Sequence, residues 1–163
     1  MTEASVQLFP YLFQPRTGSS LAAEWGQLTV PENRIAPQSH YISIPFVRFR
    51  GRPANPGTAV IFLQGGPGSS ALTYLPRIWT APVMKPPTEL ADCIFVEHRG
   101  YGFSRPSLDC PDTYDVPLDH PGSAALYADA RRQYLKKAIP FWQEQGIDIM
   151  GYNAREMAAD IDD

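Results

Sequence analysis

The sequence predicts an α/β protein whose mixed sheet comes first in the chain and whose main helices come last. Seventeen prolines lie almost entirely before residue 122, and because proline disrupts helix interiors, that part should consist of strands and loops. Two short runs, 58–63 and 93–96, are apolar throughout, which is typical of parallel strands buried on both faces. Longer helical patterns occur only after residue 122.

The first two predicted strands form a hairpin. Residues 22–30 make the first strand, and a turn over Pro31-Glu32-Asn33 ends it. Residues 41–50 make the second strand, in which apolar and polar side chains alternate. Pro45 lies inside this second strand and favours an edge position or a bulge, because proline cannot donate to a ladder.

The next two strands each lead into a segment rich in glycine. The run 58–63 is expected to be a central strand covered by helices on both faces, and it ends in Gln64-Gly65-Gly66-Pro67-Gly68. The run 93–96 leads into Glu97-His98-Arg99-Gly100-Tyr101-Gly102-Phe103-Ser104.

Helices are predicted at three places. Ser70 is expected to cap a short helix after the glycine turn, and Ser123 a longer helix that Pro140 should kink or end. Asn153 with Glu156 resembles a capping box. The residues behind it predict one apolar helix face at helical spacing: Ala154, Met157, Ala158 and Ile161. The chain ends within this pattern, and we therefore expect a truncated chain.

Composition excludes several functional classes. The chain has 163 residues, 44% apolar residues, 19% charged residues and a net charge of −3, which fits one domain or part of one. It has no Lys/Arg run typical of nucleic-acid binding and no basic amphipathic stretch typical of a membrane surface, and the longest apolar run is too short to span a bilayer. The N-terminus lacks a signal-peptide pattern, so we expect a cytoplasmic protein.

The two cysteines do not indicate a metal site. Cys93 lies in a predicted strand and Cys110 in a proline-rich loop, without metal-ligand spacing. Two free thiols are expected in a cytoplasmic protein, and a disulfide between them stays open. No motif indicates a metal or a cofactor.

The glycine turn at 64–68 carries the most chemical information. Glycines directly after a buried strand let a substrate approach the backbone, and successive N–H groups can hold an oxyanion. This arrangement suits acyl transfer, whereas a tight turn without a ligand is an equally weighted alternative. A phosphate loop is disfavoured because the turn lacks the GKS or GKT ending and no lysine lies close by.

Five segments in order resemble one enzyme family, the α/β-hydrolase serine peptidases of the proline iminopeptidase and tripeptidyl aminopeptidase type. The turn 64–68 resembles their HGGPG motif, and 97–104 resembles DQRGxGxS. Residues 107–111 (SLDCP), 146–163 (GID, then Tyr152, then ADIDD) and 25–32 (WGQLTVPE) resemble further family segments. The resemblance covers about residues 24–163.

The resemblance implies the N-terminal part of an α/β-hydrolase sheet: four strands and the first helices, without the nucleophile strand and the cap. It divides the chain into an N-terminal extension (1–21), strands with the two motifs (22–104), and a proline-rich loop with helices (105–163). It implies that Gly66, or second Gly65, donates a backbone N–H to the oxyanion hole. The other motif residues are expected to be structural: Gln64, Pro67, Gly68, Glu97, Arg99, Gly100, Gly102 and Ser104.

The chain departs from the family at several positions. Gln64 replaces the motif histidine, and Glu97-His98 replaces Asp-Gln, all with polar side chains. The family's second cysteine, expected near 138–142, is absent, which disfavours a family disulfide from Cys110.

The chain contains no G-x-S-x-G nucleophile elbow, which in this fold precedes the catalytic Asp and His. None of the three histidines fits the triad order, and His40, His98 and His120 are expected to be structural. No base can be named for Ser69, Ser70 or Ser104. Arg99 is expected to organise loops through its five donors, with a direct substrate role as the lesser alternative.

These observations predict a fragment of a serine aminopeptidase that acts through an acyl-enzyme on peptides. Two alternatives stay open: an esterase or other hydrolase of the same fold, and a non-catalytic chain whose partner carries the triad. The missing neighbour strand predicts an exposed apolar sheet edge, which should favour a complementary chain or self-association.

Overall fold

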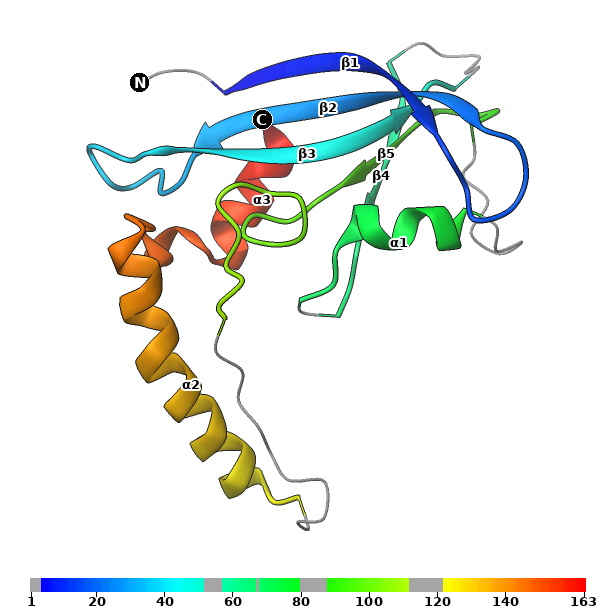
Figure 1. Cartoon of the computed structure of the whole chain (residues 1–163). Helices are drawn as coiled ribbons and strands as arrows, with labels where there is room; N and C mark the ends of the chain where they lie inside the picture. Colours follow the sequence, from blue (N-terminus) through cyan, green and yellow to red (C-terminus); the bar gives the residue numbers. More distant parts are fainter. Residues whose placement is uncertain (1–3, 52–56, 67, 80–87, 112–121) are drawn as a thin grey trace.

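The computed structural model describes residues 4–51, 57–66, 68–79, 88–111 and 122–163 of the chain. Its centre is a five-stranded mixed sheet with the order β1-β2-β3-β5-β4 (Figure 1). Together with its helices, this sheet confirms the predicted α/β class. Pro67 and His120, two positions named in the sequence analysis, lie outside the described residues.

Three strands form the antiparallel half of the sheet: β1 (Ser5–Phe13), β2 (Leu21–Pro31) and β3 (Tyr41–Phe49). β2 and β3 form the predicted hairpin. β1 lies within the segment 1–21, where the sequence predicts no strand, and pairs with β2 over all of its nine residues. The pattern missed it because β1 is exposed on both faces, so no alternation marks a buried side.

The prediction that Pro45 marks an edge strand or a bulge is wrong. β3 is a central strand that pairs with β2 on one side and β5 on the other. The Pro45 carbonyl accepts a hydrogen bond from the Glu97 N–H, just beyond the last ladder pair between Phe46 and Val96. The backbone N and O of one strand residue point to the same neighbouring strand, so an N–H at position 45 would point toward β5. Since the β3–β5 ladder ends at Phe46, the N–H that proline lacks costs no hydrogen bond within that ladder.

The parallel half of the sheet comprises β4 (Ala59–Leu63) and β5 (Asp92–Val96). Their parallel pairing is as predicted, but β4 is an edge strand and not a covered central one. Ile61 and Leu63 remain 41% and 55% exposed. A run that is apolar on both faces therefore faces solvent, because no further strand or helix among the described residues covers it.

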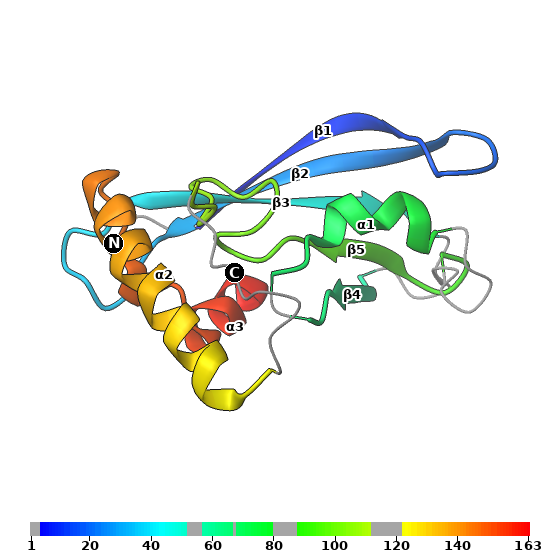
Figure 2. The same cartoon turned by 60° about the horizontal axis from the view of Figure 1, so that its bottom comes forward.

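Two helices pack on opposite faces of the sheet (Figures 1 and 2). α1 (Ala71–Ile78) buries Leu72 and Leu75 in a core that includes Phe95. The far end of α3 (Ala154–Asp162) places Ile161 against the core of the other face, which includes Val96. Since Phe95 and Val96 are neighbours in β5, they point to opposite faces.

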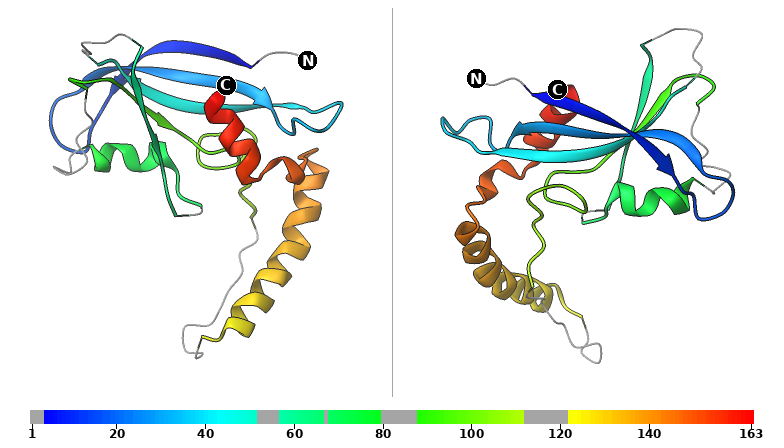
Figure 3. Two further views of the ribbon diagram at one scale, coloured as in Figure 1. Left: turned by 180° about the vertical axis from the view of Figure 1, so that it is seen from behind. Right: turned by 45° about the horizontal axis from the view of Figure 1, so that its top comes forward.

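The longest helix, α2 (Ala124–Glu144), extends away from the sheet in all views (Figure 3). Ser123 caps it as predicted, by accepting a hydrogen bond from the Leu126 N–H. The prediction that Pro140 ends or kinks the helix is wrong about the end, because the helix continues through Pro140 for another turn. The C-terminal turns pack Ala138 and Trp142 against Ile147.

The predicted apolar face of α3 is confirmed only in part, since Ile161 packs against the core and Met157 is half-buried. Ala154 and Ala158 are exposed, and the buried residues of this helix are two acids, Glu156 and Asp160. Asn153 caps the helix as expected, but Glu156 does not complete a capping box, since its carboxylate binds Arg34 instead. Ion pairs with the buried Arg99 and the half-buried Arg34 outweigh the apolar pattern here.

Candidate functional site

One pocket lies at the carboxyl ends of the two parallel strands. It has a volume of about 390 Å³. In open α/β sheets, ligands bind in the crevice outside these strand ends. The pocket joins the two glycine-containing segments that follow β4 and β5 with the start of α3, and its lining includes Gln64, Gly66, Gly68, His98, Arg99, Tyr101, Leu108, Tyr152, Asn153, Ala154 and Met157.

The glycine turn after β4 forms the first wall of the pocket. Gly66 and Gly68 have φ angles of 77° and 92°, a region in which residues with a side chain are strained. The turn closes with a hydrogen bond from the Ser69 N–H to the Gly66 carbonyl (3.1 Å). Gly66 lines the pocket, whereas Gly65 does not. The choice of the Gly66 N–H over that of Gly65 as a donor stays a prediction from the resemblance.

Glu97 fixes the start of α1 behind the glycine turn. Its carboxylate is buried and accepts hydrogen bonds from the Ser70 hydroxyl (2.6 Å) and the Ala71 N–H (3.0 Å). Ser70 in turn accepts from the Thr73 N–H, which is the predicted cap. A carboxylate at a helix N-terminus is favoured by the free N–H groups there. The two motifs are therefore joined behind the pocket.

His98 joins the same two segments at the pocket surface. Its Nε2 lies 3.0 Å from the Gln64 carbonyl oxygen, so this nitrogen carries the proton and donates. The Ser104 hydroxyl donates to the His98 carbonyl (2.7 Å). Neither contact pairs an imidazole with a serine hydroxyl, and Ser70 contacts a carboxylate. Among the described residues, no serine hydroxyl therefore contacts the imidazole of a Ser–His pair.

Arg99 is the central organiser of the layer beneath the pocket. Its guanidinium is fully buried and donates to both carboxylate oxygens of Asp160, with 2.7 Å from Nε to Oδ2. It also donates to the carbonyls of Glu32 and Gly151 (2.6 Å to the latter). These contacts tie the end of β2 to α3, and they use the fork of donors in the way expected from the sequence.

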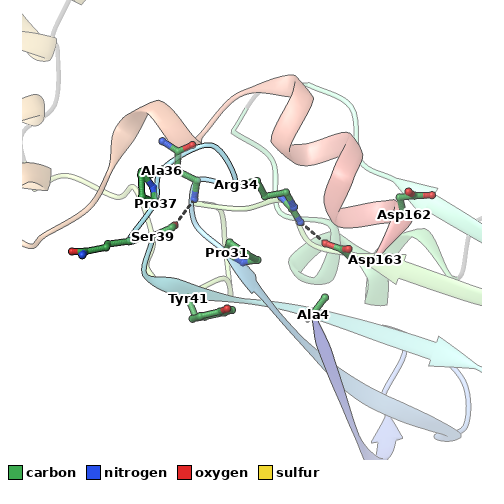
Figure 4. A pocket seen from close by; sticks show the side chains of 11 residues that line it. Ala4, Pro31, Arg34, Ala36, Pro37, Ser39, Tyr41, Asp162 and Asp163 are labelled. Atoms are coloured by element: carbon green, nitrogen blue, oxygen red, sulfur yellow. Dashed lines mark hydrogen bonds and ion pairs between the residues drawn. The ribbon is translucent and has the colours of Figure 1, made fainter. Parts of the chain in front are cut away.

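A second arginine completes this ionic cluster. Arg34 contacts Glu156 (2.6 Å), Asp160 (2.8 Å) and Asp163. These carboxylates raise the pKa of Arg34 above its ordinary value and outweigh the opposing effect of its partial burial. Arg34, Asp162 and Asp163 also line a larger, open pocket of about 860 Å³ (Figure 4), which shares no lining residue with the pocket at the strand ends.

Two further motif residues, Gly100 and Gly102, allow backbone conformations and close contacts that a side chain would prevent. Gly100 has a φ of 78°, and a Cβ there would lie 2.8 Å from the Leu108 side chain. Gly102 has a φ of 54°, and a Cβ there would lie 2.5 Å from both the Glu97 carboxylate and the Ser70 hydroxyl. Both positions therefore require glycine, because a side chain would displace the walls of the pocket.

The sequence analysis missed four charged or polar partners of these motifs: Glu32, Arg34, Glu156 and Asp160. These residues lie in or beside segments for which the sequence predicted only a turn or an apolar helix face. The one sequence signal for these partners is that an arginine such as Arg99 requires carboxylates when it is buried. The sequence does not show which carboxylates it binds, because they lie far from Arg99 along the chain.

The two cysteines are free, and burial raises the pKa of the Cys93 thiol.

Tyr152 is half-buried in the lining of the pocket and pairs with the buried Glu32. The Tyr152 hydroxyl donates to Glu32 Oε1 (2.8 Å), while the Asp148 N–H donates to Oε2 (3.1 Å). Burial raises the pKa of Tyr152 strongly, and the carboxylate of Glu32 raises it further. The neutral phenol thus stabilises the folded state. This contribution is complete below the unfolded pKa of about 10 and is lost as the pH rises above it.

Replacing Tyr152 with phenylalanine should leave one oxygen of buried Glu32 without a donor. We expect a loss of about 1–3 kcal/mol in the free energy of unfolding at neutral pH, together with a shallower loss of stability above pH 10. Urea unfolding at neutral pH and again above pH 10 measures these effects. Tyr127→Phe is the matched control, since this ring is 53% exposed on α2. An alkaline limb as steep as that of the wild type would contradict the assignment.

Comparisons with known proteins identify no family: no family model matches the chain, and no curated protein matches it. Among the described residues, no helix is both long and apolar enough to cross a membrane. In the same part of the chain, no group of three or more histidine, cysteine or acidic side chains is placed to hold a metal ion.

Proposed function

We propose that this chain supplies the oxyanion side of an α/β-hydrolase serine peptidase of the proline iminopeptidase or tripeptidyl aminopeptidase type. One observation carries the proposal: the glycine turn and the Arg-Gly segment follow adjacent parallel strands and line one pocket. The motif resemblance supports the same family. The parent reaction is the hydrolysis of an N-terminal residue or short peptide through an acyl-enzyme.

In this proposal, the Gly66 N–H stabilises the negative oxygen of the tetrahedral intermediate. A fixed donor at that position acts only when charge develops, which lowers the barrier of acyl transfer. Glu97 and His98 hold the turn from behind, by contacts to α1 and to the Gln64 carbonyl. Arg99 positions the layer beneath and does not reach the substrate, because its contacts are with Asp160 and backbone carbonyls.

The nucleophile, its base and the acid are proposed to come from polypeptide outside these 163 residues, since the chain contains no G-x-S-x-G. The free edge of β4 supports this arrangement, because the resemblance places the nucleophile strand beside it. α1 and α3 already lie on opposite faces, as the helices of a doubly wound sheet do.

A fluorophosphonate probe followed by intact-mass measurement tests the function. The purified chain should form no adduct, because none of its described serines contacts a histidine side chain. The same probe applied to the longest natural polypeptide that contains or accompanies this sequence should label the serine of a G-x-S-x-G. A stoichiometric adduct on the chain alone would refute the proposed division of roles. No label in the second sample would refute the hydrolase.

In the labelled enzyme, Gly66→Ala tests the oxyanion donor. The positive φ of Gly66 cannot hold alanine without strain, so the N–H should move and kcat should fall by about 10²–10³ with little change in KM. Gly65→Ala is the matched control, because it has no positive φ and a Cβ there meets no atom within 4 Å. A larger fall in kcat for Gly65→Ala than for Gly66→Ala would assign the donor to Gly65.

The free edge of β4 should also govern self-association of the isolated chain. We expect reversible oligomers at high concentration, because an apolar edge strand pairs with other strands. Ile61→Lys should shift the chain toward monomer in sedimentation velocity experiments. Leu90→Lys is the control, since Leu90 is 73% exposed in the turn before β5. A wild-type chain that stays monomeric and melts cooperatively at high temperature would contradict this prediction.

An esterase of the same fold would share the glycine turn, and peptide and ester substrates offered to the labelled enzyme separate the two. The alternative of a non-catalytic chain is favoured by one observation, the lack of a serine–imidazole contact among the described residues. Its signature is co-purification of a partner that carries the labelled serine on a separate chain.

A further inference from the structure

The side of α2 that is buried near its C-terminus continues toward the N-terminus as a stripe of residues that are not buried. Ala138 and Trp142 pack against the body of the protein. Toward the N-terminus, the same side of the helix continues at alternating spacings of four and three residues through Leu135, Arg131, Ala128 and Ala124. This spacing forms a continuous seam of the kind that packs against another helix.

The N-terminal two thirds of this seam is uncovered by the described residues. No side chain between Ala124 and Lys137 is buried, and Tyr127 and Leu135 are 53% and 37% exposed. Figure 2 shows this part of α2 away from the sheet. Helices gain most of their stability from packing one face, so a helix of this length with one buried end is suited to dock a partner.

Positive charge surrounds and interrupts the uncovered seam. Arg131 lies within it, and Arg132 and Lys136 lie beside it, all exposed and without an ion pair among the described residues. Asp129 is the one acidic residue between Ala124 and Lys137, although the whole chain is net negative. The sequence showed no basic amphipathic stretch, because the seam is recognised only once its buried end is known.

These charges decide which occupant fits. A second copy of the same seam would place Arg131 against Arg131, which is unfavourable. A membrane would have to accept a guanidinium in the centre of the apolar side. An apolar helix would bury Arg131 unpaired, whereas an acidic amphipathic helix would offer both an apolar stripe and carboxylates.

We propose that the uncovered part of the seam of α2, formed by Ala124, Ala128, Arg131 and Leu135 with Tyr127 at its side, docks an acidic amphipathic helix of a partner protein. Leu135 and Tyr127 contact the partner's apolar stripe, and Arg131, Arg132 and Lys136 pair with its carboxylates. The site is independent of the proposed catalytic function.

Fluorescence anisotropy with two labelled helical peptides tests the proposal on the purified chain. One peptide carries leucines on its seam and glutamates beside them, and the other has a lysine in place of each glutamate. The glutamate peptide should bind, less tightly as salt increases, and the lysine peptide should not. Arg131→Glu should weaken binding of the glutamate peptide about 10-fold, or ~1.4 kcal/mol, and create binding of the lysine peptide.

Arg155→Glu is the matched control, because Arg155 is an exposed arginine on α3 and the charge change is identical. It should leave binding of the glutamate peptide unchanged. Leu135→Ala should also weaken binding, which shows that the apolar stripe contributes, and circular dichroism checks that each variant keeps its helices. Equal binding of both peptides, no binding, equal effects of the two arginine variants, or binding of phosphatidylserine vesicles in place of the peptide would overturn the proposal.

Discussion

Replacing Arg99 with methionine should cost about 3–5 kcal/mol of the free energy of unfolding, because it removes the fully buried one of the two cations that Asp160 and Glu156 share and leaves Arg34 to face both buried carboxylates. It also removes the donors to the carbonyls of Glu32 and Gly151. Since small domains are stable by only about 5–15 kcal/mol, this loss should be visible in urea or thermal unfolding. α3 should detach first, because its buried face is ionic.

The exposed ion pair of Arg50 with Glu24 provides the control. Its distance of 2.9 Å is comparable, but the Arg50 side chain is 66% exposed. Arg50→Met should therefore leave the unfolding midpoint unchanged, since water solvates the Arg50 charge and Glu24 keeps its ion pair with Arg48. Adding Asp160→Asn to Arg99→Met should recover part of the loss, because Arg34 would then face one buried carboxylate fewer. Equal effects of the two methionine variants would show that Arg99 does not hold the layer together.

Gly151→Ala should be the second severe change, although it adds only one methyl group. A Cβ at this position would lie 2.1 Å from the Glu32 carbonyl oxygen and 2.8 Å from its carbon, and both are backbone atoms. The two segments would have to separate, which would break the hydrogen bonds that Arg99 makes to both carbonyls. We expect a loss of about 1–3 kcal/mol or more, measured by urea unfolding.

Gly65→Ala is the matched control for stability, as a Cβ there meets no atom within 4 Å. Its effect should stay within about 0.5 kcal/mol, because the position is exposed and has no positive φ. If Gly151→Ala were as mild as this control, the end of β2 and the segment before α3 could separate freely. The described clamp around Arg99 would then be wrong.

Local patterns in the sequence determined most of the elements of this protein. Alternation identified the β2–β3 hairpin, continuous apolar runs identified β4 and β5, and capping residues identified the starts of all three α-helices. Each of these signals acts within a few residues, so a single sequence contains it. The pairing of positive-φ glycines with strand ends likewise indicated where a pocket would lie.

Only the tertiary structure decided which residues cover, pair with or expose these elements. β1 is exposed at all residues but Phe13, which leaves no alternating pattern, and β4 is exposed because no strand among the described residues lies on the side away from β5. The burial of Glu156 and Asp160 on α3 depends on Arg34 and Arg99, which lie far away in the sequence, since Arg99 is 61 positions from Asp160 and Arg34 is 122 positions from Glu156. Charge pairing across such distances has no local signature, because the energy of a buried carboxylate depends on which cation the fold brings to it.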